Sequence, residues 1–340
     1  MEQRAHGSTI GPLGAVGLGC MGMSWAYSES QRDDDRAAEV VRTALDLGVG
    51  MVDTADVYGD GHNEALVGKG LAGRRDEAFL ATKGGLVVDD LPTKTMHRDA
   101  SPAHMRRAVE ASLRRLGTDV IDLYYLHRVD PAVPLEETWG ALAEMVREGR
   151  IRHLGLSEVS VEEAERAHRV HPVAAVQSEF SLWWTAARGD AAASPGGYGG
   201  RGGGGLDGPS GDVVAWCARN GAAFVPFAPL GRGFLTGAVT ADTTFEAGDF
   251  RSVNPRFQAS VREANLRIVD TVRQVADRHG ATPAQVAVAW VLAQGDHIVP
   301  IPGTKRLEYL KENVGAAEVR LSGEDLELLD GVPQAEGGRY

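Results

Sequence analysis

Four polar side chains stand at or just after the ends of short apolar runs in the first 130 residues: Asp53, Tyr58, Lys83 and His127. The runs cover 50–52, 78–82 and 121–126. Each residue alone has an ordinary explanation, such as a loop cap, rim packing, a solvated lysine or a core histidine. All four at successive strand ends are harder to explain as scaffold, because the carboxyl ends of parallel barrel strands meet at one rim. The positions therefore predict a proton-transfer site at that rim.

These residue types suit the reduction of a carbonyl group by a hydride. The carbonyl oxygen gains negative charge and needs a proton, which a tyrosine can give if its pKa falls from about 10 toward neutrality. A nearby ammonium lowers the pKa of a tyrosine by favouring the phenolate, and a carboxylate keeps a buried ammonium charged. A histidine can hydrogen-bond and orient the carbonyl oxygen. Tyr58, Lys83, Asp53 and His127 fill these four roles.

Short apolar runs alternate eight times with amphipathic stretches, and this alternation predicts the elements that would position the four residues. The expected strands are 14–19, 50–53, 78–83, 120–126, 152–156, 173–178, 223–227 and 298–301. The expected helices are 33–47, 62–71, 102–116, 135–148, 160–170, 211–219, 282–294 and 304–315, with extra helices at 262–279 and 322–330. Alternating strands and helices indicate a parallel sheet, and eight repeats favour a closed (β/α)8 TIM barrel over an open sheet.

Length and composition limit the class of protein. The chain has 340 residues, of which 43% are hydrophobic, so it can bury a large core, and its length allows one large α/β domain or two ordinary domains. The eight repeats favour a single barrel domain over residues 1–340. The formal net charge of −12 argues against nucleic acid as a partner, because duplex binding needs a basic face. Two distant cysteines, Cys20 and Cys217, predict neither a disulfide framework nor a metal site. No signal peptide or membrane span is visible, so we expect a cytoplasmic protein.

Residues 188–211 are rich in glycine and cannot bury a core. The prediction is a flexible insertion after the sixth strand. Because this insertion falls on the rim expected to carry the site, it is a candidate lid over the substrate. A nucleic-acid segment of the Arg-Gly-Gly type is the alternative, disfavoured by only two arginines in an acidic protein.

The chain resembles the aldo-keto reductases, in the branch related to aryl-alcohol and pyridoxal-type reductases and potassium-channel β subunits. Nine segments carry the resemblance in family order over nearly the whole chain: 17–22, 52–58, 81–83, 122–127, 155–158, 177–181, 227–233, 301–305 and 312–313. The resemblance implies the barrel fold, an NADPH/NADP+ cofactor bound across the barrel mouth, and a small-molecule carbonyl substrate. It also implies that Asp53, Tyr58, Lys83 and His127 are the catalytic tetrad, with Tyr58 as the general acid.

The resemblance also implies the contacts of the cofactor. Ser157 and Gln177 would hydrogen-bond the nicotinamide carboxamide, and Phe227 would stack on the nicotinamide ring. The pyrophosphate would lie against the turn after that strand, at Ala228, Pro229, Leu230, Gly231 and Gly233. Gly303 and Lys305 would open a helix whose N-terminus takes the 2′-phosphate. The remaining expected contacts are Gly19, Cys20 and Met21 on the first strand, Asp53, Tyr309, and Glu312 and Asn313, of which the last two would reach the adenine.

Several residues leave alternatives open. Trp25 and Trp183 either pack in the core or join Tyr58 and His127 in lining an aromatic substrate pocket. Arg251 and Arg256 either clamp the cofactor or are solvated loop arginines. Glu158 replaces the asparagine of many relatives.

The sequence favours an NADPH-dependent reductase of an aldehyde or ketone. The alternatives are alcohol oxidation with NADP+, ketone reduction in a biosynthetic tailoring pathway, and a cofactor-sensing subunit with little turnover. The substrate, the direction of the reaction and the oligomeric state remain open.

Overall fold

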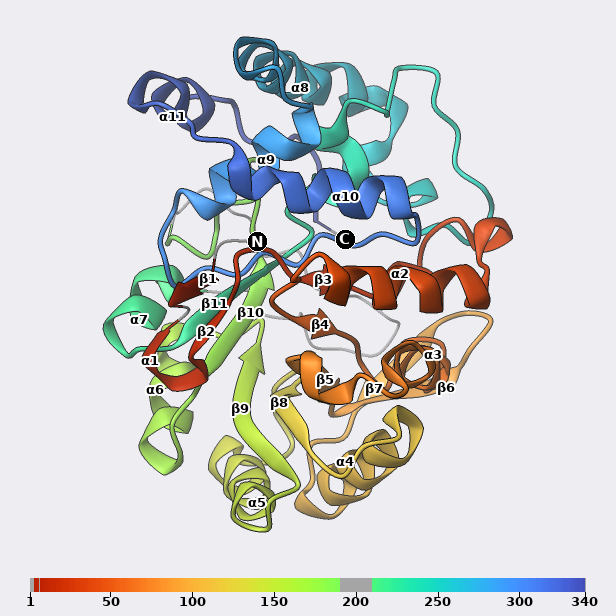
Figure 1. Ribbon diagram of the computed structural model, residues 1–340, viewed down its shortest axis with the longest axis vertical. Helices are drawn as coiled ribbons and strands as arrows, with labels where there is room; N and C mark the ends of the chain where they lie inside the picture. Colours follow the sequence, from red (N-terminus) through yellow and green to blue (C-terminus); the bar gives the residue numbers. More distant parts are fainter. Residues whose placement is uncertain (1–2, 6, 190–209, 340) are drawn as a thin grey trace.

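The computed structural model describes residues 3–5, 7–189 and 210–339. Seven parallel strands form one sheet in the order β11-β10-β9-β8-β5-β4-β3, with the helices outside them (Figure 1). The strands are β3 (Leu18–Gly19), β4 (Val52–Asp53), β5 (Leu80–Gly84), β8 (Ile121–Leu126), β9 (Ile151–Ser157), β10 (Ala175–Glu179) and β11 (Ala223–Phe227). This arrangement confirms the predicted barrel.

The segment 297–303 closes the sheet between β11 and β3. It forms only two isolated parallel bridges, Phe224 with Ile298 and Gly19 with Gly303. The N–H of Val299 donates to the carbonyl oxygen of Phe224 at 2.9 Å, and the N–H of Gly17 donates to the carbonyl oxygen of Pro300 at 2.8 Å. The strand predicted at 298–301 is therefore in place but irregular, because Pro300 and Pro302 have no N–H to give to a ladder.

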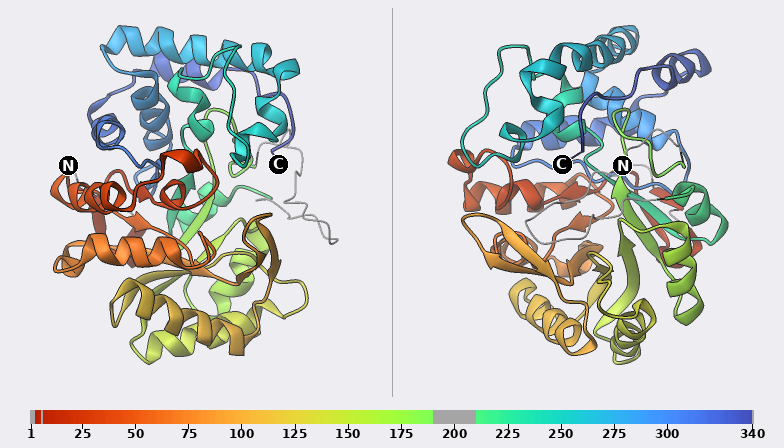
Figure 2. Two further views of the ribbon diagram at one scale, coloured as in Figure 1. Left: turned by 90° about the vertical axis from the view of Figure 1, so that its right-hand side faces the viewer. Right: turned by 180° about the vertical axis from the view of Figure 1, so that it is seen from behind.

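The helices surround the sheet, and all ten predicted helices occur with their ends shifted by less than one turn (Figures 1 and 2). They are α2 (Asp34–Asp46), α3 (His62–Leu71), α4 (Pro102–Leu116), α5 (Leu135–Arg147), α6 (Val161–Val170), α7 (Val213–Arg219), α8 (Ala259–His279), α9 (Pro283–Leu292), α10 (Leu307–Gly315) and α11 (Gly323–Asp330). None of the helices in the described part of the chain combines the length and the apolar character that a bilayer crossing requires.

Smaller elements complete the described fold. The strands β1 (Gln3–Ala5) and β2 (Pro12–Gly14) pair around α1 (Gly7–Ile10), so the strand predicted at 14–19 begins only at Leu18. An antiparallel hairpin that periodicity did not predict, β6 (Leu86–Asp90) and β7 (Thr95–Arg98), follows β5. The 3-10 turns are η1 (Met21–Met23), η2 (Glu29–Gln31), η3 (Arg75–Glu77), η4 (Gly231–Thr236), η5 (Phe250–Ser252), η6 (Pro255–Phe257) and η7 (Ala316–Glu318).

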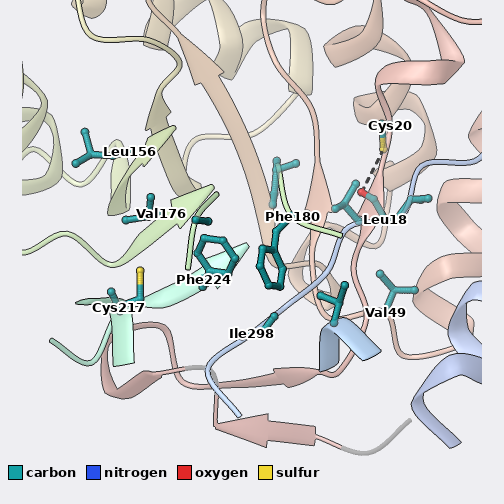
Figure 3. Close-up of a cluster of buried hydrophobic side chains, with 14 of the residues drawn as sticks. Leu18, Cys20, Val49, Leu156, Val176, Phe180, Cys217, Phe224 and Ile298 are labelled. Atoms are coloured by element: carbon teal, nitrogen blue, oxygen red, sulfur yellow. Dashed lines mark hydrogen bonds between the residues drawn. The ribbon is translucent and has the colours of Figure 1, made fainter. Parts of the chain in front are cut away.

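Alternation along the strands separates two cores. On β8, Tyr124 and Leu126 join the large cluster between the strands and the helices, part of which Figure 3 shows. Leu123 and Tyr125 join a smaller cluster that fills the barrel. The ring of Tyr125 fits there because Gly155 on the next strand has no side chain; a Cβ at Gly155 would lie 2.4 Å from the Tyr125 ring. The rim at the carboxyl ends is thus built on a packed, rigid support.

The predicted insertion at 188–211 lies almost wholly outside the described residues.

Candidate active site

Lys83 and Asp53 form a buried ion pair at the carboxyl rim. Lys83 Nζ on β5 donates to Asp53 Oδ1 on β4 at 2.5 Å and to the carbonyl oxygen of Thr54 at 2.8 Å. Both side chains are almost completely buried. Burial raises the pKa of Asp53 and lowers the pKa of Lys83, while their mutual attraction opposes both shifts. The pair therefore holds the Lys83 ammonium in a buried site, where its electrostatic effect on a neighbouring side chain is strong.

Tyr58 and His127 lie next to this pair, so the structure brings all four predicted residues together. Lys83 Nζ is 5.3 Å from the centre of the Tyr58 ring. The Tyr58 and His127 rings meet edge to face, with their centres 6.0 Å apart and an interplanar angle of 86°. Tyr58 comes from the loop after β4, and His127 is the first residue after β8.

His127 is held in its neutral form. Burial, together with the positive charges of Arg128 and Lys83, places the pKa of His127 well below its ordinary value. Its backbone N–H donates to the carbonyl of Gly84 at 2.8 Å, which fixes the end of β8 against β5. A neutral imidazole has one N–H donor and one acceptor, so it can donate to an oxygen without bringing a charge.

Ser157 and Gln177 lie opposite one another on β9 and β10, near the same rim. Gln177 Nε2 donates to Asp53 Oδ2 at 2.8 Å. Ser157 Oγ accepts from Arg128 Nη1 at 3.0 Å. Both predicted carboxamide contacts are therefore tied into the network around the tetrad.

The turn after β11 has an unusual backbone. Phe227 ends the strand, and Ala228 follows with φ of 50°. Gly231, Arg232 and Gly233 then take φ of 56°, 58° and 93°. Left-handed residues other than glycine are uncommon and persist where the surroundings hold them. Within the turn, the N–H of Gly231 donates to the carbonyl of Ala228 at 2.9 Å, and the N–H of Gly233 donates to the carbonyl of Leu230 at 3.0 Å.

Lys305 lies just before a helix rather than inside it. The helix α10 begins at Leu307 with Arg306 as its N-cap, so the predicted start at 304 is wrong. Lys305 Nζ donates to the carbonyls of Tyr27 at 3.3 Å and Ser28 at 2.7 Å. Burial lowers the pKa of Lys305 to about 8. Two cationic side chains, those of Lys305 and Arg306, thus sit at the N-terminus of α10.

The other predicted cofactor contacts occupy two regions. Gly19 ends β3, and a Cβ there would lie 2.8 Å from the carbonyl oxygen of Ile301, so only glycine fits. Cys20 is buried, its N–H donates to the carbonyl of Asp53 at 2.9 Å, and Met21 begins η1. Further along, Gly303 precedes Lys305, and α10 carries an exposed Tyr309, a half-buried Glu312 and a buried Asn313.

Trp183 and Trp25 are both buried. The Trp183 ring lies 4.3 Å from that of Phe234 and 5.3 Å from that of Phe257, and it packs under Gly231. These contacts favour the packing role for Trp183. Lys94 Nζ lies 6.0 Å from the Trp25 ring.

Both loop arginines have partners. Arg251 is half-buried and pairs with Asp249 at 2.7 Å, and Arg256 is buried, with its guanidinium carbon 4.7 Å from the centre of the Trp184 ring. The alternative of a solvated side chain is therefore wrong for Arg256.

Sequence reasoning missed a cluster of buried charges beside the site. Arg339 contacts both Glu158, after β9, and Glu179, at the end of β10. Arg232 also pairs with Glu179, at 2.9 Å. Burial alone would raise the pKa of Glu179, but the nearby arginines outweigh it and lower that pKa to about 2. No spacing rule links these segments; only the observation that Glu158 and Glu179 end strands could have pointed to them.

In the described residues, no group of three His, Cys, Asp or Glu side chains is placed to hold a metal ion.

Comparison with known proteins identifies the family of the chain. The model of the aldo/keto reductase family matches residues 15–333. An aldo-keto reductase from Schizosaccharomyces pombe, yakc, named with NADP(+), is 40% identical over 331 residues, covering 96% of this chain and 91% of that protein.

Two solved structures share the fold. A glycerol dehydrogenase from Gluconobacter oxydans has a TM-score of 0.80 and 31% identity, covering 94% of this chain and 91% of its own. An aldo-keto reductase from Klebsiella pneumoniae in complex with NADPH has a TM-score of 0.70 and 25% identity, covering 97% and 94%. The barrel, the clustered rim residues and these matches together establish that the chain belongs to the aldo-keto reductase family of oxidoreductases.

Proposed function

We propose that this enzyme reduces an aldehyde or ketone to an alcohol with NADPH, and that Tyr58 is the general acid. The observation that carries the proposal is the buried cluster of Tyr58, Lys83, Asp53 and His127 at the carboxyl rim of the barrel. Relatives named for NADP(+) and NADPH support the choice of cofactor.

The polar groups present fit a nicotinamide carboxamide. The carboxylate of Asp53 can only accept, so Gln177 must offer it the amide nitrogen, which leaves the Gln177 oxygen to accept from another N–H. The guanidinium of Arg128 can only donate, so the Ser157 hydroxyl accepts there and keeps its own proton to donate. A carboxamide needs one donor for its oxygen and one acceptor for its nitrogen, and Ser157 and Gln177 supply them.

The remaining cofactor groups have complementary residues as well. Phe227 would stack on the nicotinamide ring, with the 228–233 turn holding the pyrophosphate. Lys305 and Arg306 would bind the 2′-phosphate, and Tyr309, Glu312 and Asn313 of α10 would reach the adenine. Gly19, Cys20 and Met21 would line the cofactor from the first strand.

A bound NADPH supplies a hydride from C4 of its nicotinamide ring. His127, neutral in this setting, donates a hydrogen bond to the substrate carbonyl oxygen and orients it. Tyr58 donates its phenolic proton to that oxygen as negative charge develops there. Lys83, kept in place by Asp53, stabilises the phenolate that remains. The barrel interior behind the rim is packed, which keeps water from that side.

Alcohol oxidation by the same residues in reverse is the second candidate. A structural relative is named as a glycerol dehydrogenase, and the proton steps at Tyr58 and Lys83 run equally in both directions. Initial rates with an aldehyde and NADPH, compared with the matching alcohol and NADP+, separate the two.

The test of the mechanism is Tyr58→Phe. This variant keeps the ring and removes the proton donor, so NADPH should bind as in the wild type while reduction of a reactive aromatic aldehyde falls by about 10²- to 10⁴-fold. A cofactor titration followed by the addition of aldehyde measures both. Turnover like that of the wild type would overturn the role of Tyr58, and absence of NADPH binding in the wild type would overturn the proposed function.

A further inference from the structure

Arg128 is a buried arginine that the tetrad does not explain. It directly follows His127 and is 9% exposed. Its Nη1 donates to the carbonyl oxygen of His127 at 2.6 Å and to Ser157 Oγ at 3.0 Å. One guanidinium nitrogen thus joins the end of β8, which carries the catalytic histidine, to the end of β9, which carries the candidate carboxamide contact.

The partners of Arg128 are neutral groups. The described residues place no carboxylate in ion-pair contact with its guanidinium, whereas Lys83 nearby is balanced by Asp53. Burying a cation without a counter-charge is costly and is retained where hydrogen bonds and a function require it. Here the hydrogen bonds go to a backbone carbonyl, which is fixed, and to a serine hydroxyl, which can rotate.

The contact removes that rotational freedom. A guanidinium has no acceptor, so the Ser157 oxygen must turn a lone pair toward Arg128 and its proton elsewhere. A serine without this contact samples several hydroxyl orientations and rotamers, and only some of them donate toward the rim. A donor already oriented costs less to use in binding.

We propose that Arg128 is a positioning residue for the nicotinamide: anchored on the His127 carbonyl, it holds the Ser157 hydroxyl as the donor to the carboxamide oxygen. The inference rests on the proposed function, because it takes NADPH as the ligand. It also joins two tasks in one side chain, since the carbonyl that anchors Arg128 belongs to the histidine that orients the substrate.

A double-mutant cycle tests the proposal through binding alone. Arg128→Met keeps much of the length of the side chain and removes the donors, and Ser157→Ala removes the hydroxyl. We expect Arg128→Met to raise the dissociation constant of NADPH by about 5- to 20-fold, the scale of one charge-assisted hydrogen bond. In the Ser157→Ala background, Arg128→Met should raise the dissociation constant of NADPH by less than about twofold, because the hydroxyl that Arg128 positions is absent.

Arg128→Lys is the conservative variant. Its ammonium can still donate to the His127 carbonyl or to Ser157 but lacks the planar fork, so its affinity should lie between those of the wild type and Arg128→Met. Arg152→Met is the matched control, because Arg152 is an exposed arginine on β9 that pairs with Asp122 instead. It should leave the dissociation constant unchanged. Unfolding midpoints for each variant identify any loss of affinity caused by unfolding.

The outcomes are distinguishable. Equal losses from Arg128→Met with and without the Ser157 hydroxyl would overturn the positioning role, as would an unchanged NADPH affinity in a folded Arg128→Met. If the wild type binds no NADPH, the proposed function itself fails.

Discussion

Lys83 and Asp53 illustrate how a buried pair of charges depends on both members. Each side chain is at most 3% exposed, and each would be driven toward its neutral form by burial if the other were removed. Gln177 gives the carboxylate a second donor. The same contacts that could aim an ammonium at Tyr58 therefore contribute to the stability of the fold.

We expect Asp53→Asn and Lys83→Met each to destabilise the protein by about 3–5 kcal/mol, because each leaves the partner charge buried without compensation. The double variant should lose clearly less than the sum of the two, since no unpaired charge remains. Urea unfolding of the four proteins measures this. Additive losses would mean that the two side chains do not stabilise one another.

At the scale of elements, the sequence pattern predicted the helices well, but it missed one hairpin and misplaced the start of one helix. The helices followed from apolar periodicity, and residues such as Ser101 and Thr282 define their starts, because each side chain accepts a backbone N–H of the first turn. The β6–β7 hairpin was missed because its two strands are short and neither contains a buried residue. The start of α10 was placed too early, because Thr304 Oγ1 accepts the N–H of Arg306 and turns the chain before the helix begins.

The N-terminus of α10 gives a prediction about cofactor choice. Lys305→Ala should weaken NADPH binding by about tenfold and leave NADH binding nearly unchanged, because only NADPH carries the 2′-phosphate. Lys311→Ala, an exposed lysine on the same helix, is the control and should alter neither. With its pKa near 8, Lys305 loses its charge as the pH rises through that value, so the NADPH affinity of the wild type should fall there. An equal loss of affinity for NADPH and NADH in Lys305→Ala would mean that Lys305 does not bind the 2′-phosphate.

At the scale of the whole molecule, one carboxylate joins distant parts of the chain. Glu179 ends β10 and pairs with Arg232 after β11, Arg256 in η6 and Arg339 near the end of the described chain. Arg339 also reaches Glu158, 181 residues away in sequence. Sequence reasoning placed the tetrad because strand ends are visible as patterns. It could not place this cluster, because nothing in the spacing of the arginines says which carboxylate they meet.

Glu179 should make stability depend on pH at the acid end. Its folded pKa of about 2 lies below the ordinary value of 4.5, so its contribution is complete above pH 4.5 and is lost as the pH falls toward 2. The difference amounts to about 3 kcal/mol. Glu179→Gln should therefore be less stable than the wild type at pH 6, and the gap should close between pH 4.5 and 2. Denaturant unfolding of both proteins at several pH values measures this difference in the free energy of unfolding. A difference that does not change with pH would mean that Glu179 stabilises the fold through packing and not through its charge.

The two cysteines have a practical consequence for the study of this enzyme. Cys20 and Cys217 are buried, and burial raises the pKa of both thiols far above its ordinary value. Alkylating reagents and mild oxidants act on exposed thiolates, so neither cysteine should react while the protein is folded. A cysteine introduced at Val253, which is 74% exposed, would then be the single reactive thiol of the chain. It would accept a fluorophore at one known position without any need to remove the native sulfur atoms first.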